Sequence, residues 1–198
     1  KEKAMWLDWN MHMILVDKIK KSLGFSSETV EHPSATFATR PDSIYAPISG
    51  VLVELSEIDD DSISSGLFGR GYGIVPVGNV IYAPANGRIA ATTVSNHSIG
   101  LRTDNGIELI IHVGIDTVKM EGKGFNRLVE SEQEVKAGQP ILVFDDDAIK
   151  AAGYDDVVTV IVTSPSLLDK VKLVGQSNTL FADHPLVKIG DPLVVVKA

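Results

Sequence analysis

Alternation of apolar and polar residues is clearest between Ser95 and Asp116. In the second half of this stretch every second position is apolar: Ile107, Leu109, Ile111, Val113 and Ile115. A period of two indicates a half-buried β-strand whose apolar face lies toward the core. His112 has the opposite parity and stands next to Val113 and two residues before Gly114. We therefore expect the His112 side chain on the outward face, with free space beside it.

A hairpin is predicted between this strand and residues 97–103. The two segments are joined by Asp104-Asn105-Gly106, and Asn-Gly between alternating runs is a strong hairpin signal. With a two-residue loop, His97 becomes the diagonal neighbour of His112 on the same face of the sheet. The sequence therefore predicts that the two imidazoles meet.

The length of that loop is left open by the sequence. The two-residue loop also puts Ile99 and Leu101 on the histidine face, whereas a three-residue loop sends both of them, and His97, into the core. We expect either a β-bulge at Ser98 or Gly100, or a His97 that precedes the regular strand, because bulges commonly re-aim side chains beside functional sites.

From Ile44 onward, short apolar runs are separated by Gly, Asn, Asp and Pro at the spacing of an all-β sandwich or barrel. Two motifs occur twice. YAPISG at 45–50 is echoed by YAPANG at 82–87, and VKAGQPILV at 135–143 is echoed by VKIGDPLVV at 187–195. This duplication predicts a fold built from two similar halves.

The first 42 residues have a different character. Residues 1–25 have the pattern of an amphipathic helix, or they are a remnant of expression or of a longer chain. Both tryptophans lie here, and residues 5–23 suit a peripheral membrane contact or a partner groove. Residues 26–42 are rich in Ser, Thr and Pro and are interpreted as a linker, which leaves 43–198 as the folded domain.

Composition narrows the classes of function. The 198 residues are 44% hydrophobic and 22% charged, enough for one sizeable core. A net charge of -8 argues against a nucleic-acid partner and favours a partner protein with a basic surface. The absence of cysteine excludes disulfides, thiolate zinc sites and cysteine nucleophiles, and is typical of a reducing cytoplasm. The apolar stretches are too short to span a membrane.

His97 and His112 admit several kinds of chemistry. Zinc usually takes three or more protein ligands, and Asp116 would lie about 13 Å from His112 along an extended strand, so we do not expect a dedicated metal site. A phosphohistidine fits better, because a neutral imidazole is a good nucleophile and a second one can hydrogen-bond the phosphoryl oxygens. Such transfer needs mainly positioning, and no cofactor is expected. Ser95 is a candidate to orient His97. Two purely structural histidines remain an alternative.

The hairpin sequence IHVGIDTV, the following GKGF, and the segments IYAPISG, GRGYGIVPVGN and APANG resemble the glucose-type enzyme IIA domain of the bacterial phosphoenolpyruvate-dependent sugar phosphotransferase system, over residues 43–198. The resemblance implies an antiparallel β-sandwich of the duplicated hybrid type and a phosphotransferase. His112 would take a phosphoryl group from the histidine-containing phosphocarrier protein and pass it to a cysteine of a IIB domain, for sugar uptake and phosphorylation. His97 would be the second active-site histidine, and Ser95 its orienting hydroxyl.

The same resemblance implies a partner surface. Asp60 and Asp116 would be the carboxylates that meet arginines of the phosphocarrier, and Ile63, where phenylalanine is common in the family, would join Val113 in an apolar centre. The location implied is the cytoplasm, with a possible contact at the inner face of the membrane.

Two alternatives come from other classes. Lys119, in VKME, could be the modified lysine of a biotinyl or lipoyl carrier domain. Against this, the strand at 135–142 follows Lys119 where a carrier has it before, and Val118 replaces the expected methionine. The other alternative is a regulatory binding module that uses the same surface without turnover.

Overall fold

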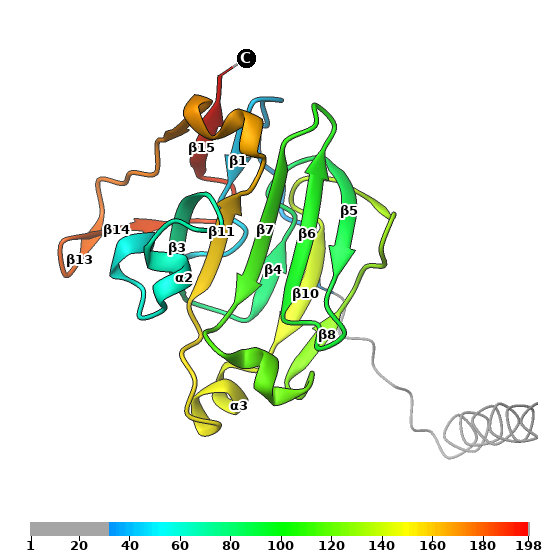
Figure 1. Cartoon of the computed structure of the whole chain (residues 1–198), viewed down its shortest axis with the longest axis vertical. Helices are drawn as coiled ribbons and strands as arrows, with labels where there is room; N and C mark the ends of the chain where they lie inside the picture. Colours follow the sequence, from blue (N-terminus) through cyan, green and yellow to red (C-terminus); the bar gives the residue numbers. More distant parts are fainter. Residues whose placement is uncertain (1–31, 198) are drawn as a thin grey trace, which may run out of the picture. The chain divides into compact units, whose positions relative to one another are not determined.

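The computed structural model describes residues 32–197, so the expected helix at 1–25 and the contact expected at 5–23 lie outside the described residues. The described part is all-β with a few short helices, as predicted (Figure 1). No helix in this part is long and apolar enough to cross a membrane. Its strands and helices are β1 (Ser43–Tyr45), β2 (Gly50–Glu54), η1 (Leu55–Glu57), α2 (Asp61–Ser64), β3 (Arg70–Pro76), β4 (Val80–Tyr82), β5 (Gly87–Thr92), β6 (Ser98–Thr103), β7 (Glu108–Val113), η2 (Thr117–Met120), β8 (Phe125–Arg127), β9 (Glu134–Val135), β10 (Pro140–Phe144), α3 (Asp146–Ala151), β11 (Val158–Val162), η3 (Pro165–Lys170), β12 (Val171–Leu173), β13 (Leu180–Phe181), β14 (His184–Val187) and β15 (Pro192–Val196).

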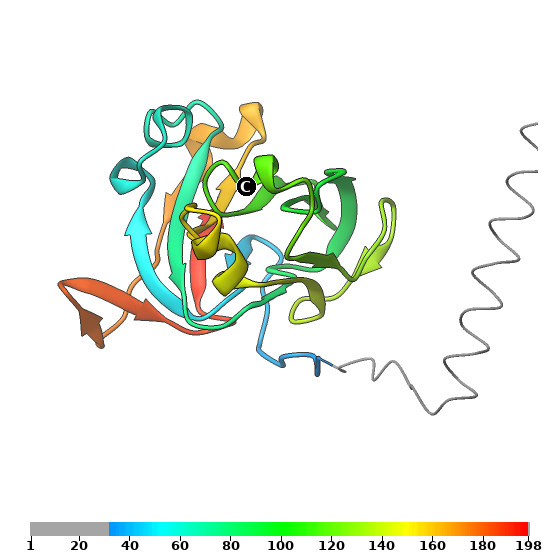
Figure 2. The ribbon, with the colours of Figure 1, turned by 90° about the horizontal axis from the view of Figure 1, so that it is seen from below.

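The strands form three sheets, and neighbouring strands pair antiparallel. The largest sheet has the order β13-β14-β2-β3-β11-β7-β6-β5-β9. The two three-stranded sheets have the orders β1-β15-β12 and β4-β10-β8. Figure 2 shows the strands curving around a common interior. This arrangement confirms the predicted antiparallel architecture.

The duplicated motifs occupy equivalent places in the fold. Residues 45–50 connect β1 to β2, and residues 82–87 connect β4 to β5. The two turns also bond to each other reciprocally: the amide of Tyr45 donates to the carbonyl of Pro84 at 3.0 Å, and the amide of Tyr82 donates to the carbonyl of Pro47 at 2.8 Å. β1 pairs with β15 as β4 pairs with β10. The prediction of two similar halves is confirmed.

The large sheet is covered on both faces at its centre. All five residues of β11 are buried. Val158 and Val160 belong to the main core, whereas Ile161 belongs to a second apolar cluster with Ile58 and Ile63. This second cluster packs the segment from η1 to α2 against the sheet, because an apolar strand face is stabilised when water is excluded from it. That segment forms one wall of the functional site.

The β6–β7 hairpin has a three-residue loop. The amide of Thr103 donates to the carbonyl of Ile107 at 2.8 Å, and Gly106 adopts a φ of 84°, as such loops require. Ile99 and Leu101 are consequently buried in the core, at 1% and 0% exposure. The two-residue loop is therefore wrong, because it would expose both of these side chains.

His97 precedes the regular strand, which was one of the two arrangements expected from the sequence. Its carbonyl accepts a hydrogen bond from the amide of Val113 at 2.9 Å, yet β6 begins only at the next residue. The register irregularity nearby lies in β5, between Ile89 and Ala91, and not in β6 where a bulge was expected. The position of His97 outside the ladder frees its ring to turn toward His112.

The expected linker at 26–42 contacts the domain over part of its length. The amide of Ala35 donates to the carbonyl of Gly138 at 2.8 Å. The ring of Phe37 lies 5.3 Å from that of Tyr45, at an angle of 49°. These contacts attach the chain before β1 to the duplicated turns.

Candidate functional site

Both histidines line one cleft of about 310 Å³. Their ring centroids are 4.8 Å apart and the rings are nearly perpendicular, at 80°. The floor of the cleft is formed by β6, β7 and β11, and its walls are α2 and η2, with contributions from Asp60 and Asp116. The prediction that the two imidazoles meet is confirmed.

The strand pairing fixes the place of His112. It lies in β7 directly opposite Ser98 of β6 and Thr159 of β11. Burial, and to a smaller extent the neighbouring His97 ring, lower the pKa of His112 to about 4. The backbone of Gly114 and the negative charge of Asp60 act in the opposite direction, but they do not offset burial. The imidazole of His112 is therefore neutral at pH 7.

The two nitrogens of His112 have different surroundings. Nδ1 is buried without a hydrogen-bond partner, and the backbone of Gly114 lies close to the ring. Nε2 is consequently the nitrogen that reaches the cleft. In a neutral imidazole one nitrogen carries the proton and the other a lone pair. A proton on the buried Nδ1 leaves the Nε2 lone pair facing the cleft.

Two hydroxyl groups lie beside Nδ1 of His97. Ser95 Oγ lies 2.7 Å from His97 Nδ1, and Thr93 Oγ1 lies 3.5 Å from the same atom. His97 is 5% exposed, and burial lowers its pKa. The phenyl ring of Phe125 lies 6.4 Å from the imidazole at 72°. With Nδ1 bonded to Ser95, Nε2 is the nitrogen left for the cleft, as expected of an orienting hydroxyl.

The chain turns sharply after β7. Gly114 has a φ of 77°, and a Cβ at this position would lie 2.3 Å from Thr117 Cγ2, so only glycine fits. Asp116 has a φ of 60°, and its carboxylate forms an ion pair with Lys119 at 2.6 Å. This turn brings Asp116 back to the cleft. The expectation of an extended strand reaching Asp116 is therefore wrong.

Within residues 32–197 no group of three or more His, Cys, Asp or Glu side chains is arranged to hold a metal ion. His97, His112 and Asp116 line the same cleft, but Asp116 is paired with Lys119.

Asp60 is the acidic residue of the run 59–61 that lines the cleft. Its carboxylate caps α2 by accepting from the amides of Ser62 and Ile63, both at 2.9 Å. Its charge also raises the pKa of His112, which places it within electrostatic reach of the ring. Ile63 lines the cleft but is only 6% exposed, so most of its surface packs inside the second apolar cluster.

The exposed apolar rim differs from the one predicted. Val113 is 0% exposed and lies in the main core, so its assignment to a partner surface is wrong. β7 turns its odd-numbered residues inward, and Val113 follows that parity. Phe68 and Val118, 48% and 54% exposed, line the cleft instead. Neither was predicted to belong to a partner surface, because no periodic pattern marks either of them.

Lys119 does not lie at a hairpin tip. It is part of the 3-10 helix η2, after β7, and its ammonium group is paired with Asp116. A biotinyl or lipoyl carrier presents its lysine on a hairpin tip, so the structure does not support that alternative.

Comparison with known proteins identifies the family. A family model described as phosphoenolpyruvate-dependent sugar phosphotransferase system, EIIA 1, matches residues 42–167. The chain belongs to this family. The resemblance noted from its motifs is thereby confirmed, and the two-histidine cleft lies within the matched residues.

Several relatives of this EIIA domain are much longer proteins. The N-acetylglucosamine-specific EIICBA component of Klebsiella pneumoniae is 35% identical over 148 residues, which cover 75% of this chain and 23% of that protein. The beta-glucoside-specific EIIBCA component of Bacillus subtilis is 37% identical over 145 residues, 72% of this chain and 24% of that protein. This chain therefore spans about a quarter of the length of the curated relatives that it matches.

A solved structure supports the same assignment. The glucose permease IIA from Mycoplasma capricolum matches with a TM-score of 0.65 and 27% sequence identity, covering 82% of this chain and 100% of that one. The match confirms the EIIA fold that the motifs implied.

Proposed function

We propose that this EIIA domain is a phosphoryl carrier in sugar uptake. Nε2 of His112 accepts a phosphoryl group from the histidine-containing phosphocarrier protein and passes it to a cysteine of a IIB domain. The observation that carries the proposal is the cleft itself, in which a neutral His112 turns one nitrogen outward beside a second neutral imidazole, His97.

The chemistry follows from the protonation state of His112. The lone pair on Nε2 attacks the phosphorus of the donor phosphohistidine, a new P–N bond forms, and the P–N bond to the donor breaks. The electron pair of the broken bond returns to the donor imidazole, so the step needs no external acid, metal or cofactor. A protonated His112 would have no lone pair to offer, and a pKa of about 4 avoids that state at neutral pH.

His97 supports the transfer without carrying the phosphoryl group. We assign the Ser95 hydroxyl as the donor to Nδ1, which puts the proton of His97 on Nε2 and makes Nε2 the donor on the cleft side. A neutral N–H donor can hydrogen-bond the phosphoryl oxygens and so stabilise the negative charge that they carry in the transition state. We expect this role to be greatest in the step from His112 to the IIB cysteine.

The proposal leaves the sugar open. Relatives that are 35–37% identical to this chain are named for N-acetylglucosamine, beta-glucoside, mannose and glucose. Similar identity across these four specificities suggests that sugar selection belongs to parts of the longer proteins that lie outside this domain.

The test is intact-mass measurement after incubation with phosphoenolpyruvate, enzyme I and the phosphocarrier. The wild-type chain should gain the mass of one phosphoryl group, and His112→Gln should gain none. His184→Gln is the matched control, because His184 is bonded to Glu57 and does not line the cleft. A wild-type chain that binds the carrier but takes no phosphoryl group would support the regulatory binding module instead.

The role of His97 is tested by separating the two half-reactions. His97→Gln should be phosphorylated by the carrier at close to the wild-type rate but should pass the group to a IIB domain slowly. Unchanged onward transfer would assign His97 a structural role.

A further inference from the structure

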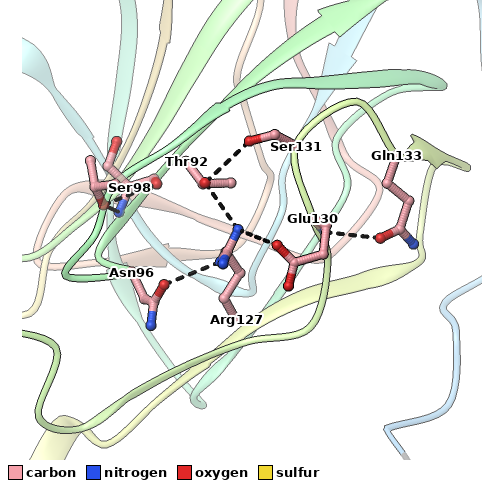
Figure 3. A network of polar contacts seen from close by, with 8 residues as sticks. Thr92, Asn96, Ser98, Arg127, Glu130, Ser131 and Gln133 are labelled. Carbon is pink, nitrogen blue, oxygen red and sulfur yellow. Dashed lines mark hydrogen bonds and ion pairs between the residues drawn. The ribbon is translucent and has the colours of Figure 1, made fainter. Parts of the chain in front are cut away.

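Arg127, the last residue of β8, forms hydrogen bonds to both ends of the turn that leads into His97 (Figure 3). Its Nε donates to Asn96 Oδ1 at 3.1 Å, and its Nη1 donates to Thr92 Oγ1 at 2.9 Å. Thr92 is the last residue of β5, and Asn96 directly precedes His97. One rigid, planar guanidinium therefore bridges the connection between β5 and β6.

The conformation held by this bridge sets the orientation of His97. Asn96 has a φ of 57°, in the left-handed region, which costs a non-glycine residue about 1 kcal/mol. Asn96 separates Ser95 from His97, so the left-handed turn brings Ser95 Oγ to 2.7 Å from His97 Nδ1. Loosening Asn96 would release this hydrogen bond.

β8 contacts the same turn at a second point. Phe125 lies two residues before Arg127, so both side chains leave the strand on one face. The Phe125 ring contacts the His97 imidazole, and Arg127 holds the residue beside it. The Arg127 side chain is only 20% exposed, so its hydrogen bonds compete little with water.

We propose that Arg127 is a positioning residue for His97, acting through Asn96 to keep the Ser95–His97 hydrogen bond in place. The inference rests on the proposed function only for its kinetic consequence, because the geometry of His97 can be measured without any transfer. Arg127 does not line the cleft and is not a catalytic residue.

Four variants test the proposal. Arg127→Met removes both hydrogen bonds. Asn96→Gly removes the acceptor while tolerating the positive φ, and Asn96→Asp keeps an acceptor at the same place. Glu130→Gln is the matched control, because Glu130 pairs with the same guanidinium at 3.1 Å from a side chain that is 78% exposed. Urea unfolding shows whether each variant is folded.

The direct readout is the ¹⁵N NMR spectrum of the His97 ring across a pH titration. In Arg127→Met and Asn96→Gly the ring nitrogens should shift toward those of an unrestrained imidazole, and the pKa of His97 should rise toward 6.5. In Asn96→Asp and Glu130→Gln the ring nitrogen shifts and the pKa of His97 should stay as in the wild type. Onward transfer to a IIB domain should fall by up to about a hundredfold in the first pair, the scale expected when a group at the reacting centre is misplaced by about 1 Å, while phosphorylation by the carrier continues.

Unchanged His97 signals in folded Arg127→Met would overturn the proposal. If Arg127→Met does not fold and Asn96→Gly has wild-type signals, Arg127 serves stability alone, and the proposal is equally overturned. A wild-type chain that accepts no phosphoryl group would contradict the proposed function, but the NMR result would still decide the role of Arg127.

Discussion

The imidazole rings of His97 and His112 meet edge to face, with centroids 4.8 Å apart and an angle of 80°. Burial lowers the pKa of both residues. The His97 ring also disfavours a positive charge on His112, because two imidazolium groups at this separation repel. The cleft therefore holds two neutral rings at physiological pH, one suited to attack phosphorus and the other suited to donate a hydrogen bond.

The lowered pKa of His112 predicts a loss of stability in mild acid. Below pH 6.5 the unfolded chain takes up a proton on His112, whereas the folded chain does so only near pH 4, so the free energy of unfolding falls between these values. The gap corresponds to about 3 kcal/mol. Burial of His97 adds a loss of the same sign. Urea unfolding from pH 7 to pH 4 measures the decrease.

The matched variant for this prediction is His112→Gln, which cannot titrate. Its free energy of unfolding should depend less on pH than that of the wild type across the same range. Equal dependence in the two proteins would mean that His112 is not buried in its neutral form.

Asp116 should set the rate of encounter with a basic partner. Asp116→Asn should slow phosphorylation by the carrier most at low ionic strength and approach the wild type at high salt. Lys119→Met is the opposing control, because it frees the carboxylate of its ion pair and should speed the encounter at low salt. Stopped-flow phosphorylation over a salt series measures both. A loss in Asp116→Asn that does not vary with salt would assign Asp116 to the turn after β7.

Phe68 and Ile63 should respond differently to replacement by serine. Phe68 is 48% exposed in the cleft wall, so Phe68→Ser should weaken carrier binding at every salt concentration with little loss of stability. Ile63 is 6% exposed in the second apolar cluster, so Ile63→Ser should lower the free energy of unfolding by about 2–4 kcal/mol. Calorimetric titration and urea unfolding separate the two effects. Tight binding by folded Phe68→Ser would remove Phe68 from the interface.

Thr159 carries a buried hydroxyl with no hydrogen-bond partner, directly across from His112. Thr159→Val keeps the shape and removes the unpaired group, so the free energy of unfolding should rise by about 1 kcal/mol. Thr103→Val is the matched control. The Thr103 hydroxyl bonds Asn105 at 2.6 Å and the amide of Ile107 at 3.0 Å, and its loss should destabilise. A destabilised Thr159→Val would indicate that a bound water satisfies this hydroxyl.

The sequence alone predicted the strand that carries His112, because alternation over residues 107–113 is regular and Asn-Gly marks the hairpin. It could not fix the loop length, since Asp104-Asn105-Gly106 suits a loop of two or three residues. The burial of Ile99 and Leu101 decides for three, and that depends on the core formed by distant strands. A choice of this kind rests on tertiary packing and not on local pattern.

Other parts of the site depend on backbone geometry or on contacts between distant residues. The turn at Gly114 and Asp116 has positive φ at both positions, which an extended-strand reading does not anticipate. Arg127 reaches Asn96 from 31 residues away, and no periodicity links them. Phe68 belongs to a segment folded over the sheet by apolar contacts that become visible only in three dimensions.

The proposed phosphorylation of His112 at Nε2 can be measured by ³¹P–¹⁵N correlation NMR on chain labelled with ¹⁵N-histidine and phosphorylated by the carrier, with His97→Gln used to assign the signals. We expect one phosphohistidine, bonded through Nε2 of His112, in both the wild type and His97→Gln. A phosphorus signal coupled to Nδ1 of His112, or to either nitrogen of His97, would contradict this proposal.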